Sequence, residues 1–183
     1  MNLSSKIILG IDPGTIIMGY GLISVQKSDF KVISLGAIQI KEKDQVLRLK
    51  TIHSKIIQLI KTHLPDECAI EAPFFGKNAQ SMLKLGRAQG VCMAAAISMD
   101  IPVTEYSPKK IKQSITGNGN ASKEQVAAML QSLCKFNRMP KHLDATDGLA
   151  TAVCHHFQST SISPAGKFKS WKDFISKNPH RIQ

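Results

Sequence analysis

Short apolar runs separated by turn residues dominate the first forty residues, a pattern typical of closely spaced β-strands. Residues 6–11 are almost continuously apolar and stop at Asp12, which a proline and a glycine follow. Residues 19–26 and 31–40 are two further strand-like segments. Because antiparallel strands can be joined by short turns, we expect a meander of three antiparallel strands.

The spacing of apolar residues then changes to that of helices. From Val46 to Ile60 they recur three or four positions apart, which predicts an amphipathic helix that ends before Pro65. The other elements are predicted in this order: a strand over 67–71, a helix over 78–99, a strand over 101–106, a short helix over 109–114, a helix that begins after Ser122 and a helix over 144–157.

Two helix starts carry recognisable capping patterns. Ser107 is a suitable N-cap, with a proline at the first helical position after it. The pattern Ser122-x-x-Gln125 resembles a capping box. In the helix that follows, we expect the buried face to consist of four apolar residues: Val126, Met129, Leu130 and Leu133.

The element order β-β-β-α-β-α-β-α-α-α predicts an α/β fold with a mixed sheet flanked by helices, in which parallel strands extend the three antiparallel ones through helical crossovers. The 183 residues suffice for one domain, which we place at residues 1–158. Residues 159–183 are rich in Ser, Pro, Gly and Lys. We interpret them as a basic, flexible C-terminal tail, in which Phe168 and Trp171 could form part of a short docking helix.

The chain carries 24 Lys and Arg residues against 13 Asp and Glu residues, a formal net charge of +11, which favours a polyanionic partner. Charged residues interrupt every apolar stretch well before the ~20 residues of a membrane helix. Residues 1–6 have no signal-peptide pattern, so we expect a cytoplasmic protein without membrane contact. The four cysteines are far apart and predict neither a zinc site nor a disulfide framework.

Four carboxylates lie at the ends of predicted elements. Asp12 and Glu71 each end an apolar strand, whereas Asp144 and Asp147 open the last helix. Each has an ordinary explanation alone, since Asp is common in turns and acids in a first helical turn complement the helix dipole. Those explanations do not account for the shared pattern. The spacing of Asp144 and Asp147 places both on one helix face.

Such acids in a basic chain predict a magnesium site within a phosphate-binding surface, and hence a nuclease. Mg²⁺ prefers hard oxygen ligands. Phosphodiester hydrolysis works well with two such ions ~3.5–4 Å apart. Two ions require carboxylates from separate elements, because neighbours on a strand point to opposite faces.

Four motifs, in order over residues 6–157, resemble those of the RuvC Holliday-junction resolvases. They are Gly10-Ile11-Asp12-Pro13-Gly14-Thr15, the segment from Glu71 to Gly86, the segment from Ile111 to Val126, and Asp144 to His155. The resemblance implies a ribonuclease-H-like nuclease domain. It also implies a structure-selective endonuclease that resolves Holliday junctions by paired, symmetric, magnesium-dependent hydrolysis in homologous recombination and DNA repair.

The resemblance assigns roles to individual residues. Two Mg²⁺ ions, for which Mn²⁺ is a possible substitute, would be held by the four carboxylates: Asp12, Glu71, Asp144 and Asp147. Lys112 and Lys123 match lysines near the scissile phosphate, where they would offset its negative charge.

Three further residues match family positions that contact DNA. Phe74 matches an aromatic residue that stacks on a base of the opened junction, and the neighbouring Phe75 is a rival for that role. Lys77 and Asn78 match residues that contact the DNA backbone, which would position the junction rather than read its sequence.

The helix over 78–99 carries Gly86, Gly90 and Ala94, which form a smooth stripe. From packing alone, we expect this stripe to lie on the sheet of its own subunit. The resemblance implies instead that part of the helix forms a homodimer interface, and two symmetric sites suit the equivalent strands of a four-way DNA junction. It also implies association with the RuvA and RuvB branch-migration proteins.

Two positions depart from the family pattern. Gly148 stands where alanine is usual, and glycine costs a helix ~1 kcal/mol relative to alanine. Residues 87–90 read Arg-Ala-Gln-Gly instead of the usual Gln-Ala-Arg-Gly, which leaves the role of Arg87 open.

Two alternative functions remain at this point. An actin-like ATPase lobe also begins with a strand followed by D-x-G-T, but such enzymes need two lobes, and this sequence has one such motif. A non-catalytic junction-binding module would have the same fold without the chemistry, although the presence of all four acids argues against it.

Overall fold

The computed structural model describes residues 5–73, 78–135 and 144–160, and it confirms the predicted order of strands and helices. The elements are β1 (Lys6–Asp12), β2 (Ile17–Gln26), β3 (Asp29–Gln39), α1 (Gln45–His63), β4 (Glu67–Glu71), α2 (Ala79–Ile97), β5 (Val103–Tyr106), α3 (Pro108–Thr116), α4 (Lys123–Cys134) and α5 (Asp144–Thr160). Within these ranges, no helix is both long enough and apolar enough to cross a membrane.

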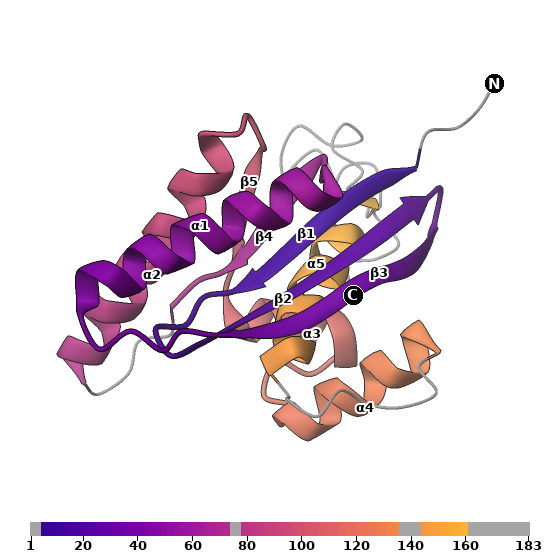
Figure 1. The fold of residues 1–183 in the computed structure, drawn as a ribbon. Coiled ribbons are helices and arrows are strands. Elements are labelled where there is room, and N and C mark those ends of the chain that lie inside the picture. Colours follow the sequence, from indigo (N-terminus) through magenta and orange to yellow (C-terminus); the bar gives the residue numbers. More distant parts are fainter. Residues whose placement is uncertain (1–4, 74–77, 136–143, 161–183) are drawn as a thin grey trace, which may run out of the picture.

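The five strands form one mixed sheet in the order β3-β2-β1-β4-β5. β1, β2 and β3 pair antiparallel, whereas β4 pairs parallel with both β1 and β5. The predicted antiparallel meander with parallel extensions is therefore confirmed. Figure 1 shows α1 and α2 on one face of this sheet and α3, α4 and α5 on the other.

Side-chain alternation along the strands divides the core between these two faces. Leu9 and Ile11 of β1 are fully buried in the cluster under α1 and α2. Ile8 belongs to the second cluster, which α3, α4 and α5 cover. Gly10 and Asp12 share the side of Ile8, so Asp12 ends β1 on the face that carries α5.

Helix α5 lies unusually close to the middle of the sheet because glycines face one another across the contact. A Cβ placed on Gly10 would lie 2.3 Å from the backbone of Ala152, and one on Gly21 would lie 2.4 Å from Leu149 Cα. From the helix side, a Cβ on Gly148 would lie 2.5 Å from the backbone of Tyr20. Gly148 therefore has a packing role that the helix-propensity argument did not anticipate.

The predicted caps are confirmed. The Ser107 side chain accepts a hydrogen bond from Lys110 N, with Pro108 at the start of α3. At the start of α4, Ser122 and Gln125 form both hydrogen bonds of a capping box. Helix α5 continues to Thr160, beyond its predicted end at residue 157.

The predicted buried face of α4 is partly wrong. Val126 and Leu130 are buried, but Met129 and Leu133 are 40% and 39% exposed. The helix buries the side formed by Val126, Ala127 and Leu130 against α3 and α5. Because α4 lies at the outside of this layer, Met129 and Leu133 face away from the core. Val46 of α1, which the apolar periodicity included, is likewise exposed.

The glycine stripe of α2 does not lie on the sheet of its own subunit, so that prediction is wrong. A Cβ added to Gly86 or Gly90 would meet nothing within 4 Å of the described residues. The buried face of α2 consists of Ala88, Gln89, Cys92, Ala95 and Ala96. The stripe therefore faces away from the described part of the chain.

Replacement of Gly148 by alanine tests the close approach of α5. The added methyl group would crowd the β2 backbone, and such overpacking costs ~1–3 kcal/mol. This exceeds the ~1 kcal/mol that alanine contributes through helix propensity. We expect Gly148→Ala to lower the free energy of unfolding in urea. A higher free energy would mean that propensity dominates and that the contact is not tight.

Candidate active site

Two carboxylates meet at the carboxyl ends of β1 and β4. These parallel strands are in register, with Gly10 opposite Ala69 and Ile11 opposite Ile70. Asp12 and Glu71 follow as the next residues of each strand, so they lie on neighbouring strands and on the same face. Both side chains point to the side that α5 covers.

The first turn of α5 brings two further carboxylates to this point. Asp144 and Asp147 lie three residues apart on one helix face. Carboxylate oxygens of Asp12, Asp144 and Asp147 all lie within 4.8 Å of one another. Asp12, Glu71 and Asp147 line one small pocket. The structure thus brings together all four predicted carboxylates, which we call the acidic cluster.

Three members of the acidic cluster hold their protons unusually strongly. Burial raises the pKa of Asp12 from its ordinary value to about 7, and the negative charge of Asp147 adds to this rise. Burial and the nearby charges of Asp12 and Asp147 raise the pKa of Glu71 to about 8. Burial also raises the pKa of Asp147. Like charges in a poorly hydrated site therefore oppose full ionisation.

Both predicted lysines line the same pocket as the carboxylates. Lys123 Nζ donates to Asp147 Oδ2 at 2.6 Å. Partial burial disfavours the charged amine, but this hydrogen bond and the surrounding acids outweigh it, so the pKa of Lys123 is raised. Lys123 therefore stays cationic beside the acidic cluster.

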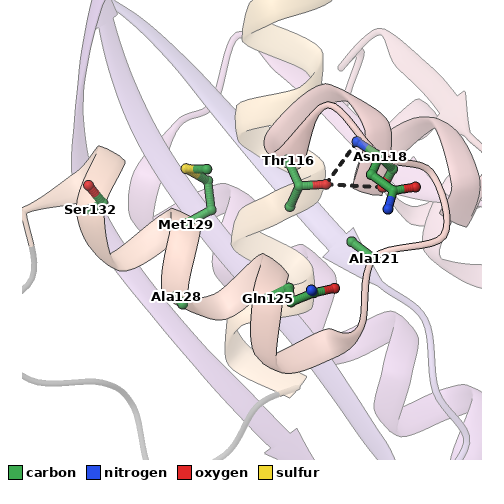
Figure 2. Close-up of a pocket in the computed structure, with 7 residues that line it drawn as sticks. All are labelled: Thr116, Asn118, Ala121, Gln125, Ala128, Met129 and Ser132. Atoms are coloured by element: carbon green, nitrogen blue, oxygen red, sulfur yellow. Dashed lines mark hydrogen bonds between the residues drawn. The ribbon is translucent and has the colours of Figure 1, made fainter.

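Hydrogen bonds fix the end of α3, which carries Lys112, at the start of the loop to α4. Thr116 Oγ1 lies 2.8 Å from the carbonyl oxygen of Lys112 and accepts a hydrogen bond from Asn118 N at 3.1 Å. Gly117 has a φ of 76°, a left-handed conformation that suits glycine. Figure 2 shows Thr116 and Asn118 joined across this turn.

Figure 2 also shows a groove on the outer side of this loop and of α4. It has a volume of about 620 Å³ and is lined by Thr116, Asn118, Ala121, Gln125, Ala128, Met129 and Ser132. Its lining includes no member of the acidic cluster, so the groove is separate from the candidate active site.

The chemistry of the acidic cluster fits a divalent cation. Its donors are carboxylate oxygens, the ligand type that Mg²⁺ prefers. They come from β1, β4 and α5, which lets several point inward together. Burial and mutual repulsion raise the pKa values of Asp12 and Glu71, and a bound cation would offset both effects. The cluster could therefore hold a metal ion.

The predicted DNA-contacting residues are only partly within the described chain. Phe74 and Lys77 lie outside the described residues. Asn78 lies at the N-terminus of α2, where its side chain accepts a hydrogen bond from Ser81 N at 3.1 Å. Its observed role is therefore that of a helix cap.

Gln89 was not among the predicted site residues. Arg87, the neighbouring position singled out in the sequence, is exposed. Gln89 is 8% exposed, lines a pocket with Asp12 and Glu71, and its Nε2 donates to Glu105 Oε2 at 2.5 Å. The exchange of Arg and Gln in residues 87–90 was the available signal, because it places a neutral amide beside the acids.

Comparisons with known proteins identify the family of the chain. A family model described as "Crossover junction endodeoxyribonuclease RuvC" matches residues 8–155. The crossover junction endodeoxyribonuclease RuvC of Christiangramia forsetii is 57% identical over 98% of this chain and 94% of its own length. RuvC of Bacteroides fragilis is also 57% identical, over 97% of this chain and 96% of its own.

Solved structures agree in fold. Thermus thermophilus RuvC in complex with a Holliday junction substrate superposes with a TM-score of 0.78 and 27% identity, over 85% of this chain and 95% of that one. The yeast mitochondrial Holliday junction resolvase Ydc2, at 16% identity and a TM-score of 0.61, shares the fold. The chain therefore belongs to the RuvC family of crossover junction endodeoxyribonucleases.

Proposed function

We propose that this chain resolves four-way DNA junctions by paired, symmetric, magnesium-dependent phosphodiester hydrolysis in homologous recombination and DNA repair. The observation that carries the proposal is the convergence of the acidic cluster from β1, β4 and α5 in a chain of net charge +11. The complex of the Thermus thermophilus relative with a Holliday junction supports the choice of substrate.

We further propose that Asp12, Glu71, Asp144 and Asp147 hold two Mg²⁺ ions, with Mn²⁺ as a possible substitute. When bound, such ions supply the Lewis acidity and the activated water that phosphodiester hydrolysis needs. These carboxylate ligands come from three elements, so small shifts of α5 would change the geometry of the metal site directly. The raised pKa values of Asp12 and Glu71 mean that the cation competes with protons for the oxygens of these two residues.

Lys112 and Lys123 would act on the phosphate. Both line the pocket of the acidic cluster, so a phosphodiester that enters it meets two cations. Positive charge placed where negative charge develops stabilises the transition state. Lys123 is held by Asp147 in the free protein and would divide its interactions between that acid and the phosphate. Phe74, Lys77 and Asn78 remain proposed DNA contacts.

We propose a homodimer formed through α2. Leu83 and Ile97 are 62% and 58% exposed, and they lie on the helix face that carries Gly86, Gly90 and Ala94. Small residues between exposed apolar ones allow two helices to approach closely. From the family, we also expect association with RuvA and RuvB and a cytoplasmic location. From the composition, we expect a nuclease domain at residues 1–158 and a tail at 159–183.

Membership of the RuvC family disfavours an actin-like ATPase lobe. A non-catalytic junction-binding module remains distinguishable by experiment. The acidic cluster is complete and paired with a lysine, which such a module would not require.

Replacement of Asp12 by asparagine tests the proposed chemistry. The substitution keeps the side-chain shape but removes a charged ligand, so we expect junction cleavage to fall by at least ~10²-fold. Binding to the intact junction should stay within a few-fold of the wild type, as measured by gel shift without metal. Asp29→Asn, an exposed change on the β2–β3 hairpin, is the matched control. Retained cleavage by Asp12→Asn would refute the assignment.

The raised pKa values predict a pH-dependent stability without metal. In the folded protein the pKa of Asp12 is about 7 and that of Glu71 is about 8. The folded protein therefore binds more protons than the unfolded chain at pH values between the ordinary carboxyl pKa and these raised values. This stabilisation is complete below the ordinary carboxyl pKa and is lost as the pH rises through these values. We expect the free energy of unfolding in EDTA to fall by a few kcal/mol between about pH 5 and pH 9.

Asp12→Asn should flatten this pH dependence, whereas Asp29→Asn should leave it unchanged. Mg²⁺ should restore stability at high pH, because it binds the ionised carboxylates of the folded state. A wild-type stability that rises over the same pH range would contradict the assigned direction.

A further inference from the structure

A second set of polar side chains joins the sheet to α5 on the same face as the acidic cluster. His155 is 7% exposed, and both ring nitrogens have partners: Nδ1 lies 2.9 Å from the Tyr106 hydroxyl, and Nε2 lies 2.6 Å from Glu67 Oε2. The other oxygen of Glu67 pairs with Lys6 Nζ. We call these four residues the polar bridge; it connects β1, β4, β5 and α5.

The polar bridge and the acidic cluster both join β4 to α5, and their residues are separated by matching distances along the two elements. Glu67 and Glu71 are four residues apart on β4, which corresponds to ~13 Å along a strand. Asp147 and His155 are eight residues apart on α5, which corresponds to ~12 Å along a helix. The two sets are therefore parallel connections between β4 and α5, one at each end of the contact.

Tyr106 links the polar bridge to the acidic cluster itself. It lies opposite Glu71 in the β4–β5 register, and its carbonyl oxygen accepts a hydrogen bond from Ala72 N at 2.8 Å. The backbone of Tyr106 thus holds the strand end that carries Glu71. Its hydroxyl meanwhile holds His155 of the helix that carries Asp147.

The hydrogen bonds of the polar bridge give α5 a direction that its packing does not supply. Against β1 and β2, α5 packs closely through glycines and apolar side chains, which sets the separation of the two layers. A neutral imidazole satisfies both contacts of His155: Nε2–H donates to Glu67, and Nδ1 accepts from the Tyr106 hydroxyl. This arrangement constrains the axial position and rotation of α5 relative to β4 and β5.

We propose that Tyr106, His155 and Glu67 are positioning residues of the nuclease: they set α5 against β4 and β5 so that Asp147 and Glu71 can bind the same metal ions. The proposal rests on the proposed metal-dependent function. None of these three residues lines a pocket that contains members of the acidic cluster. They act on the site through the strand and the helix that they hold.

The test compares Tyr106→Phe and His155→Gln with His156→Gln. Tyr106→Phe removes one hydroxyl and keeps the ring, so the fold should persist. His156 is the matched control, because it is also buried on α5 but its Nε2 lies 3.2 Å from Ser28 O, at the distant β2–β3 turn. The first measurement is the Mg²⁺-induced rise in melting temperature, titrated without DNA.

We expect the wild type and His156→Gln to show the same Mg²⁺ concentration dependence. Tyr106→Phe and His155→Gln should require at least ~10-fold more Mg²⁺ for the same rise, which is the usual effect of disturbing residues that orient metal ligands. Junction cleavage should show the same shift in Mg²⁺ requirement. Junction binding without metal should change less than twofold, because the DNA-facing lysines are untouched.

Two outcomes would overturn the inference. One is an unchanged Mg²⁺ dependence in Tyr106→Phe and His155→Gln when both are folded. The other is an equal shift in His156→Gln, which would indicate general loosening of α5. If the wild type itself neither bound Mg²⁺ nor cleaved the junction, the proposed function would fail instead, so the two failures are distinguishable.

Discussion

The close contact between α5 and the strands β1 and β2 is the constraint on which the rest of the structure depends. Gly10 and Gly21 in the sheet and Gly148 in the helix remove the side chains that would otherwise separate the two layers. The first turn of α5 consequently reaches the carboxyl end of β1. Only at that separation do carboxylate oxygens of Asp144 and Asp147 lie within 4.8 Å of Asp12.

This arrangement places stability and function in opposition. Acids that are held together by tight packing cannot all ionise easily, and the pKa values of Asp12 and Glu71 rise to about 7 and 8. A fold under selection for stability alone would separate these groups or pair each with a base. Lys123 offsets part of the repulsion through Asp147. The remaining repulsion makes the site favourable for a divalent cation, as is common where perturbed carboxylates cluster.

Much of the fold could be predicted because its signals are local. The change from strand to helix periodicity predicts the element order, and the apolar runs before Asp12 and Glu71 locate two acids at strand ends. The spacing of Asp144 and Asp147 predicts their shared helix face. Joining these three places into one site required the matched motifs, since periodicity alone does not specify which strands are neighbours.

What could not be predicted depends on contacts between residues far apart in the chain. The direction of the Gly86 and Gly90 stripe and the exposure of Met129 follow from which helices pack together, and their own sequence does not contain that information. The bridge from His155 to Glu67 spans 88 positions, and no local pattern marks it. The exchange of Arg and Gln in residues 87–90 marks Gln89 in the sequence, but its position beside the acids follows only from how α2 packs.

The decisive measurement is cleavage of a labelled synthetic four-way junction, beside linear duplex of the same sequence. We expect paired nicks at symmetric positions on the junction, dependent on added Mg²⁺, with the duplex left intact. Tight junction binding without nicks would contradict this expectation, and so would equal cleavage of both substrates. Binding without nicks would make the chain a junction-binding protein, and equal cleavage of junction and duplex would make it an unselective nuclease.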